Sequence, residues 1–314
     1  MHQENTNWNK HGGYDLSIVI VNYNGGAVLP SCLKAIDSAS AGLKVQTIIV
    51  DNGSDDRSGL SCCDNLSIRV ICLGKNLGFS AANNIGIREA HGRYFLLLNS
   101  DCFVQPGLFQ MLMSILDENP RAAVVGPRLL NKDGTLQPSC HNFPSPLVFL
   151  LEQSMLWRLL QHMPILNTFP LQIAQPHDKA GKVDWVSGSC MLVRPTALHQ
   201  VGGFDNAFFF YWEEADLCFR LKQEGWDTLF EPAACAVHLG GGSTTQSGML
   251  MLFFTSLYRF YAKHYLRRQF VTVRALVRLM ALLKAARYGF SSGFGASREA
   301  SSKQFHRWVD IAKR

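Results

Sequence analysis

Residues 16–26 of this 314-residue chain read LSIVIVNYNGG, an apolar run that ends in a polar turn. β-Branched side chains dominate the run, which predicts a short strand covered on both faces of a sheet. The turn from Asn22 to Gly26 ends that strand. Because a helical stretch follows the turn, the pattern is typical of a parallel α/β sheet.

The same pattern recurs further along the chain. Strands are expected at 46–50, 67–72 and 93–98, with intervening helices that end near Ser38 and His91, the second capped by Ser80. The second half is less regular, with strands expected at 183–193 and 235–238 and a helix at 214–223. This alternation predicts a parallel sheet with helices on both faces.

Polar side chains collect where the predicted strands end. These positions are Tyr23, Asp51, Asn76 and Asp101. Ligands of such sheets bind beyond the carboxyl ends of the strands, where one carboxylate can accept hydrogen bonds from a ribose and another can hold a divalent cation against a diphosphate. The pattern favours a nucleotide-diphosphate ligand with a metal. The acids at 55–56 are equally well explained as solvated residues at a helix start.

Three further acids follow the aromatic residues at 208–212. Glu213, Glu214 and Asp216 are candidate general bases, because apolar walls and a neighbouring acid both raise a carboxyl pKa toward neutrality. The alternative is structural, with Asp216 forming a surface ion pair with Arg220 four residues later. His238 precedes a glycine-rich stretch and is a candidate metal or phosphate ligand, with a structural role as its alternative.

Composition and missing motifs exclude several classes of protein. With 47% hydrophobic and 17% charged residues, the chain is not intrinsically disordered. No uninterrupted apolar run reaches the roughly 18 residues of a membrane span, and we expect no secretory signal at the polar start. Nine cysteines without zinc-type spacing indicate reduced thiols in the cytoplasm. Neither G-x-G-x-x-G after the first strand nor a P-loop motif occurs, which argues against a dehydrogenase or P-loop ATPase.

Positive charge is concentrated at the C-terminal end of the chain. Residues 258–314 hold 13 of the 30 Lys and Arg but only 2 of the 24 Asp and Glu. In a helix over 266–288, Arg267, Arg274 and Arg278 share one face, and Leu266, Val273, Leu276, Met280 and Leu283 lie on the other. Such a helix is suited to an anionic membrane surface, or alternatively packs on the rest of the protein. Few aromatic residues lie between the arginines, so nucleic acid is not an expected partner.

Seven motifs in a fixed order resemble those of the family-2 inverting glycosyltransferases, and most closely their rhamnosyltransferase-like branch. They are SIVIVNYNG at 17–25, IIVDNGSDD at 48–56, NLGFSAANNIGI at 76–87, FLLLNSD at 95–101, VSGSCMLVRPTAL at 186–198, GGFDNAFFFYWEEADLCFRL at 202–221 and HLGGGS at 238–243. The resemblance implies a glycosyltransferase-A fold, which is a Rossmann-like, mostly parallel central sheet flanked by helices.

We accordingly expect three segments. A polar extension covers 1–15, a catalytic domain covers 16–257, and a basic amphipathic helical tail covers 258–314. Within the catalytic domain, the nucleotide-binding half is expected at about 16–130 and the acceptor half at about 131–257.

The resemblance also implies roles for individual residues. Positions that match nucleotide-sugar contacts are Tyr23, Asn24, Asp51, Asn76, Gly78, Asn99, Asp101, Trp185 and Gly188. Asp101 matches the last acid of the DxD metal motif and is its only acid here, because Asn99 stands in place of the first. Asp101 and His238 are therefore expected to hold Mg²⁺ or Mn²⁺. Glu214 matches the catalytic base, with Glu213 as the other candidate.

The implied function is metal-assisted transfer of a sugar to a hydroxyl of a lipid-linked or cell-surface polysaccharide, such as lipopolysaccharide. Rhamnose from dTDP-rhamnose is the first candidate donor, and a single displacement inverts its anomeric centre. The expected partners are this nucleotide-sugar donor, the glycan acceptor and an anionic membrane contacted by 266–288. We thus expect a cytoplasmic protein, peripheral at the inner face of the membrane.

Two other functions stay open at this point. A catalytically silent sugar-nucleotide or nucleic-acid binding protein fits the amide at Asn99. A nucleotidyltransferase of similar fold fits the sheet and its acids, although the turn at 22–26 lacks the Lys or Arg expected of a triphosphate loop.

Overall fold

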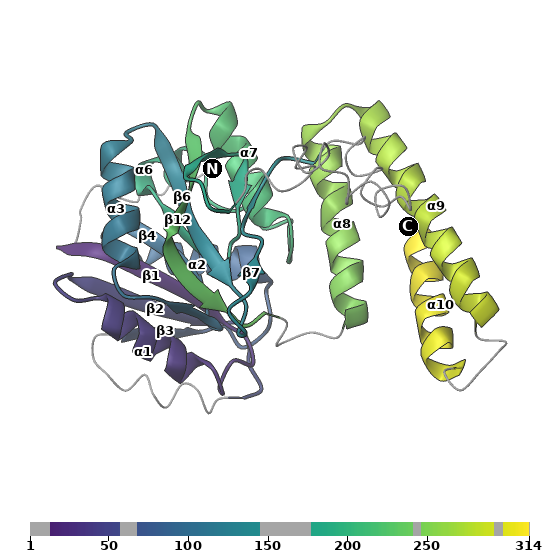
Figure 1. Ribbon diagram of the computed structural model, residues 1–314, viewed down its shortest axis with the longest axis horizontal. Helices are drawn as coiled ribbons and strands as arrows, with labels where there is room; N and C mark the ends of the chain where they lie inside the picture. Colours follow the sequence, from purple (N-terminus) through teal and green to yellow (C-terminus); the bar gives the residue numbers. More distant parts are fainter. Residues whose placement is uncertain (1–12, 57–67, 145–176, 241–245, 292–297, 314) are drawn as a thin grey trace. The chain divides into compact units, whose positions relative to one another are not determined.

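The fold is described from a computed structural model, whose described residues are 13–56, 68–144, 177–240, 246–291 and 298–313. The chain forms two compact units (Figure 1), which we treat separately. The sheet unit comprises 1–143 and 173–243, and the helical unit comprises 144–172 and 244–314. Most of the expected N-terminal extension, residues 1–12, lies outside the described residues, as does 241–243 of the last motif.

One mixed sheet organises the sheet unit. Its main strand order is β3-β2-β1-β4-β11-β6-β12-β5. These strands are β1 (Tyr14–Asn22), β2 (Val45–Asp51), β3 (Ile68–Cys72), β4 (Gly92–Asn99), β5 (Cys102–Val104), β6 (Ala122–Leu130), β11 (Cys190–Val193) and β12 (Asp227–His238). Short strands β7 (Leu136–Gln137) and β9 (Gly181–Val183) pair with β6 and β12, while β8 (Cys140–His141) pairs with β10 (Trp185–Val186).

The first four strands are parallel, as the sequence predicts. Strand β1 lies between β2 and β4, with Asn22 opposite Asp51 and Val21 opposite Asn99. The carboxyl ends of three strands therefore end at one level of the sheet. Beyond β4 the sheet is mixed, because β11 runs antiparallel to both β4 and β6, whereas β12 runs parallel to β6.

Two apolar cores lie on opposite faces of this sheet. One is closed by α1 (Leu29–Ala39) and α3 (Leu108–Glu118). The other is closed by α2 (Phe79–Arg88), α6 (Pro195–Gln200) and α7 (Glu213–Gln223). The predicted α/β class, with helices on both faces, is thus confirmed.

Helix α2 begins differently from the prediction. Its N-cap is Gly78, with a φ of 86°, and Ser80 lies inside the first turn as a fully buried residue. The backbone N–H of Phe79 donates to the carbonyl oxygen of Phe209 at 2.7 Å. The carbonyl group of Phe209, in a loop distant along the chain, therefore accepts a hydrogen bond from the first turn of α2. A capping serine side chain would accept such a bond in other helices.

Three helices form the described part of the helical unit. They are α8 (Gln246–His264), α9 (Arg267–Ser291) and α10 (Arg298–Lys313). Buried side chains between them include Phe260, Val273, Val277, Trp308 and Ile311. In the described part of the chain, none of the helices is both long and apolar enough to cross a membrane.

The division into compact units falls near residue 244, whereas the charge pattern suggested a boundary at 258. Residue 258 lies within helix α8. The excess of Lys and Arg begins within α8. The last strand of the sheet, β12, has already ended at His238, before α8 begins. Surface charge does not determine where a packed core ends.

The contact between α2 and the sheet leads to a prediction. A Cβ at Gly86 would collide with Cγ1 of Val19 and lie 3.0 Å from Cγ2 of Val50. We expect Gly86→Ala to lower the free energy of unfolding by about 1–3 kcal/mol, as overpacking does, in a urea titration. The double variant Gly86→Ala/Val19→Ala removes the obstructing methyl groups, so its loss should be smaller than the sum of the two single losses. Strict additivity would contradict this contact.

Candidate active site

The ends of β1 and β2 hold a buried polar cluster around Asp51. One carboxylate oxygen of Asp51 accepts hydrogen bonds from Nδ2 of Asn22 at 3.0 Å and from Oγ of Ser54 at 2.6 Å. The other oxygen accepts from the backbone N–H of Ser54. Asn24, with a φ of 53°, donates its backbone N–H to Ser54 and accepts from the N–H of Asp55. Tyr23, which lies between Asn22 and Asn24 in the sequence, is half-buried.

A second set of hydrogen bonds joins this cluster to the loop after β3. The side chain of Asn52 donates to Oδ1 of Asn76 at 3.0 Å and accepts from the N–H of Leu77 at 2.8 Å. Oδ1 of Asn76 in turn accepts from the N–H of Gly78 at 2.9 Å. A Cβ at Gly78 would lie 2.6 Å from the carbonyl oxygen of Phe209, so only glycine allows the aromatic loop to approach so closely. The predicted positions 23, 24, 51, 76 and 78 therefore form one continuous rim.

Asp101 and His238 meet at the other edge of the sheet. The antiparallel pairing of β12 with β5 sets His238 opposite Cys102, and Nε2 of His238 lies 3.3 Å from Oδ1 of Asp101. Burial alone would raise the pKa of Asp101, but the hydrogen bond and charge of His238, with the backbone N–H of Gly240, lower it below its ordinary value. Nδ2 of Asn99 lies 3.3 Å from the same Nε2.

The orientation of His238 depends on Gln137. Nδ1 of His238 lies 2.7 Å from Oε1 of Gln137, whose amide nitrogen donates to Asn131. With Nδ1 donating to that oxygen, Nε2 is turned toward Asp101 and Asn99. Gln137 thus has the position of an outer partner that fixes the tautomer of a ligating histidine.

The turn at 187–189 connects Glu214 to this pair. The backbone N–H of Gly188 donates to Oε1 of Glu214 at 3.4 Å. The adjacent Ser189 accepts from the side chain of Asn99 at 3.4 Å, and its carbonyl oxygen accepts the Asn99 backbone N–H. A series of contacts therefore leads from Glu214 through the turn and Asn99 to His238, which lies beside Asp101.

Glu213 and Glu214 start helix α7 in different environments. The side chain of Glu213 is 3% exposed, whereas Glu214 is half-buried. Burial raises the pKa of Glu213 well above its ordinary value, and the charge of Glu214 raises it further. Burial also raises the pKa of Glu214, partly offset by backbone N–H groups that include that of Gly188. The two adjacent acids therefore bind protons more tightly than free glutamate does.

Two left-handed residues precede these acids. Tyr211 and Trp212 have φ values of 70° and 69°, a conformation that costs a non-glycine residue about 1–3 kcal/mol. The turn brings the helix start under the 187–189 segment, where Glu214 contacts Gly188. Strain of this kind persists only where surrounding packing imposes it, and Trp212 is buried.

Asp216 has a structural environment. It is fully buried, and its carboxylate accepts from Nε of Arg220 at 2.8 Å. The remaining guanidinium nitrogens of Arg220 donate to the carbonyl oxygens of Val201 and Gly203. The geometry does not support Asp216 as a base, and the pair with Arg220 is an interior one rather than the surface pair of the alternative interpretation.

Trp185 lies in an aromatic group near the same turn. Its ring stacks on His141 with centroids 4.2 Å apart, and its Nε1 donates to the carbonyl oxygen of Asn142. Trp212 lies 6.1 Å away, centroid to centroid. Gly188 faces Glu214 and the ring of Phe79, each within ordinary contact distance of a Cβ built on it.

Sequence reasoning missed Gln137 and Ser189, and it placed the ion pair of Arg220 with Asp216 at the surface rather than in the interior. Ser189 lies inside a quoted motif, so its neighbours could have drawn attention to it. Gln137 lies on a two-residue strand far from any motif and had no such signal. Its role follows only from the contact with His238.

Asp101 and His238 fit a divalent cation as a partial ligand set. Among the described residues, no group of three or more His, Cys, Asp or Glu side chains is arranged to hold a metal. A carboxylate oxygen and an imidazole nitrogen 3.3 Å apart can bind one cation whose other ligands come from a diphosphate and water. When His238 is neutral, a bound cation supplies the positive charge that offsets the carboxylate of Asp101.

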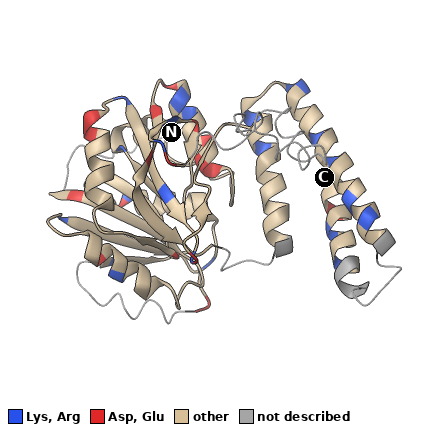
Figure 2. Ribbon diagram, viewed as in Figure 1, with Lys and Arg blue, Asp and Glu red and all other residues tan. Residues whose placement is uncertain are grey.

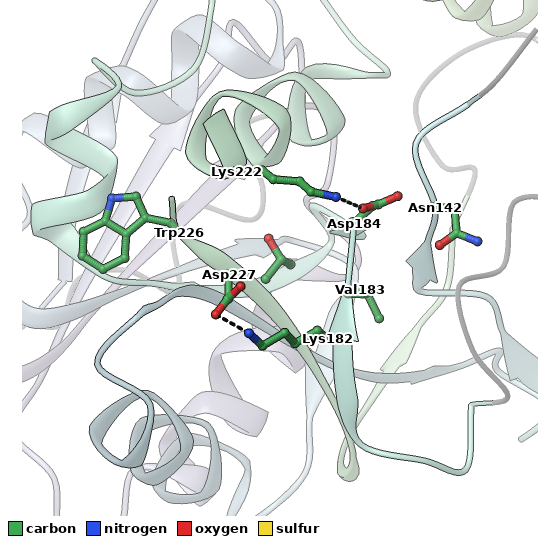
Figure 3. A pocket seen from close by; sticks show the side chains of 8 residues that line it. Asn142, Lys182, Val183, Asp184, Lys222, Trp226 and Asp227 are labelled. Carbon is green, nitrogen blue, oxygen red and sulfur yellow. Dashed lines mark hydrogen bonds and ion pairs between the residues drawn. The ribbon is translucent and has the colours of Figure 1, made fainter. Parts of the chain in front are cut away.

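A separate pocket of about 190 Å³ lies at the opposite end of β12 from His238 (Figure 3). Its charged side chains pair with each other, Lys222 with Asp184 and Lys182 with Asp227, each at 2.7 Å. None of the predicted site residues lines this pocket.

Two solved structures resemble this chain in fold. A crystal structure of GalNAc-T7 with UDP, GalNAc and Mn²⁺ matches with a TM-score of 0.59 at 13% identity, over 95% of this chain and 56% of the other. The mannosyltransferase PcManGT from Pyrobaculum calidifontis, in complex with GDP-Man and Mn²⁺, matches with a TM-score of 0.55 at 12% identity, over 95% of this chain and 86% of the other. The sheet unit thus has the glycosyltransferase-A fold.

The sequence itself assigns the family. The family model described as "Glycosyl transferase family 2" matches residues 17–202, and the chain belongs to this family. N-acetylglucosaminyl-diphospho-decaprenol L-rhamnosyltransferase of Mycobacterium tuberculosis is 30% identical over 241 residues, covering 73% of this chain and 77% of the relative. A low-salt glycan biosynthesis hexosyltransferase of Haloferax volcanii is 28% identical over 67% of this chain and 62% of its own length. The predicted resemblance to rhamnosyltransferase-like members is confirmed.

The environment of Asp216 predicts a structural rather than a chemical defect. Asp216→Asn leaves the guanidinium of Arg220 without its counter-charge, so we expect a loss of about 3 kcal/mol of unfolding free energy by urea titration. Asp117→Asn, at a partly exposed ion pair with Arg93, is the control and should cost about 1 kcal/mol or less. An Asp216→Asn protein of normal stability would contradict the structural assignment.

Proposed function

We propose that this glycosyltransferase inverts its donor sugar, depends on a divalent metal, and transfers the sugar to a hydroxyl of a lipid-linked or cell-surface polysaccharide. Rhamnose from dTDP-rhamnose is the first donor to test, because the rhamnosyltransferase of Mycobacterium tuberculosis is 30% identical over most of both chains. The observation that carries the proposal is the series of contacts from Glu214, through the 187–189 turn and Asn99, to His238 and Asp101.

Glu214 is the proposed catalytic base. An acceptor hydroxyl is a weak acid, so a carboxylate must take its proton as the oxygen attacks the anomeric carbon. Glu214 is half-buried as a residue, while its Oε2, like that of Glu213, is buried and has no hydrogen-bond partner among the described residues. Glu213 is almost fully buried, which favours Glu214 as the acid that reaches an acceptor.

Asp101 and His238 are the proposed protein ligands of Mg²⁺ or Mn²⁺. When bound, the cation supplies Lewis-acid stabilisation of the charge that develops on the departing nucleoside diphosphate. The neutral amide of Asn99, 3.3 Å from Nε2 of His238, adds no charge to the proposed metal site. Gln137 holds Nδ1 of His238, so Nε2 is directed at Asp101.

The rim around Asp51 is the proposed nucleoside site. Asp51, Asn76 and Gly78 lie at the ends of adjacent strands, joined by Asn22, Asn52 and Ser54. Tyr23 and Asn24 belong to the same turn. Trp185 and Gly188 are proposed to line the sugar and acceptor side, because they flank Glu214 and the aromatic group.

The acceptor and location follow from chemistry and charge. The mycobacterial relative is named for a diphospho-decaprenol acceptor, so a polyprenyl-linked glycan is the class proposed here. A cytoplasmic enzyme bound to the inner face of the membrane through residues 266–288 would meet such an acceptor, and the basic composition of that segment suits anionic lipid.

A donor panel tests the function without knowledge of the acceptor. Thermal shift is measured for each nucleotide sugar with Mg²⁺, Mn²⁺ or chelator, since a ligand that binds the folded state raises its melting temperature. We expect a metal-dependent shift with one donor, dTDP-rhamnose first. A folded protein that responds to none would support a catalytically silent member of the family.

The base assignment predicts a specific loss of activity. Glu214→Gln should lower turnover by about 10²-fold or more while the donor-induced thermal shift stays near that of the wild type. In the wild type, kcat/KM should fall on acidification with a midpoint above the ordinary pKa of glutamate, because burial raises the pKa of the base and only its carboxylate form accepts a proton. Glu118→Gln, an exposed acid on α3, is the matched control. Near-normal turnover of Glu214→Gln would remove this residue from the mechanism.

The contact of Gln137 with His238 predicts a change in metal affinity. Gln137→Leu removes the acceptor for Nδ1, so the affinity for Mn²⁺ in the presence of nucleoside diphosphate should fall about tenfold or more, by electron paramagnetic resonance. Gln137→Glu keeps an acceptor oxygen and should retain binding. Gln110→Leu is the control, because that amide donates to the backbone carbonyl oxygens of Ala39 and Ala41, away from His238. Unchanged affinity in Gln137→Leu would contradict this role.

A further inference from the structure

Helix α9 exposes large apolar side chains to solvent. Val271, Leu279, Leu282 and Leu283 are 54%, 55%, 56% and 64% exposed. Ala275 and Ala286 are exposed at intervening positions. Spacings of four, seven and eight residues put this set on one side of the helix, over about 18 Å at 1.5 Å per residue from 271 to 283. We refer to these residues, 271, 275, 279, 282, 283 and 286, as the outward face of α9.

The opposite side of α9 is also apolar, but it is buried. Val273, Val277, Ala281 and Ala285 have almost no exposed area and face the interior of the helical unit. The apolar face predicted from sequence is therefore partly wrong. Two of its members, Val273 and Met280, are packed inside, whereas Leu266 and Leu283 are exposed.

The outward face is not needed to pack the described helices. An amphipathic helix of a globular protein has one apolar stripe, which the interior covers, and a polar face toward water. Here none of the described helices of the unit covers a second apolar stripe, and contiguous exposed apolar surface of this kind marks an interaction site. Helix α9 is thus packed against its own unit on one side and still exposes four large aliphatic side chains on the other.

Charge around the outward face identifies the partner chemistry. Helix α9 contains six Lys and Arg and no Asp or Glu. Arg268 and Arg287 are exposed near the two ends of the outward face, and Figure 2 shows Lys and Arg along α9. An apolar stripe with flanking arginines matches an anionic lipid surface, whose headgroups pair with arginine while the aliphatic side chains enter the acyl boundary.

We propose that the outward face of α9 is the surface that inserts into an anionic bilayer, with α9 lying in the plane of the membrane. This inference rests on the membrane location in the proposed function and names the residues that make the contact. It does not depend on the identity of the donor sugar. The buried face holds α9 to its own unit while the outward face contacts lipid, so insertion does not require the unit to unfold.

Vesicle flotation tests the proposal with the full-length protein. Phosphatidylcholine vesicles are compared with vesicles that also contain phosphatidylglycerol. We expect the wild type to float with the anionic vesicles, and Leu279→Gln/Leu282→Gln/Leu283→Gln to lower its partition coefficient about tenfold or more. These side chains are exposed, so folding should be unaffected. Met111→Gln/Leu136→Gln, at exposed apolar positions of the sheet unit, is the matched control and should bind as the wild type does.

The charge component is tested separately with Arg268→Gln/Arg287→Gln, which should weaken binding at low salt and reduce its salt dependence.

Equal flotation of the triple-Gln variant and the wild type would overturn the proposal. A wild-type dimer that the triple-Gln substitution converts to a monomer, with no flotation by either protein, would overturn it in favour of a second copy on this face. The donor-induced thermal shift of the same proteins reports on the catalytic proposal independently, because it requires no lipid.

Discussion

The parallel pairing of β1 with β2 and β4 is the constraint on which the site depends. Its register sets Asn22 against Asp51 and Val21 against Asn99, so polar residues far apart in sequence end at one level of the sheet. The strand interiors are mostly apolar, with Ser17 of β1 and Thr47 of β2 as buried polar exceptions, and a shift of one residue would turn every side chain of a strand toward the opposite face of the sheet. Because both faces are packed, a slip would move side chains of β1 into the opposite core, where they do not fit, so the packing that fixes the sheet also fixes the site.

The second half of the chain adds Glu214 and His238 to the site. Strand β11 enters beside β4 and carries the 187–189 turn to Asn99, while the antiparallel pairing of β12 with β5 delivers His238 to Asp101. The site keeps two costly features: two left-handed aromatic residues and two adjacent glutamates, of which Glu213 is buried and Glu214 is half-buried. Such features persist where the surroundings impose them, and here they gather around Glu214.

Much of this could be predicted from local pattern. Apolar runs identified β1, β2 and β4 because their interiors are buried on both faces, and that burial leaves a continuous signal in the sequence. Polar residues directly after those runs had to gather, because parallel strands end at one edge. The family motifs further separated Asp101, Glu214 and His238 from other acids and histidines, which composition alone cannot do.

By itself, then, the sequence determined the α/β class, the first four strands and the residues at their ends, because these depend on local hydrophobicity and chain direction. Only the tertiary structure decided the direction of β11, the cap of α2, the ion pair that removes Asp216 from the candidate bases, and the place of Gln137 behind His238. It also decided which side of α9 is buried. These depend on contacts between residues distant along the chain, and an apolar helix position has the same sequence signature whether a neighbouring helix covers it or not.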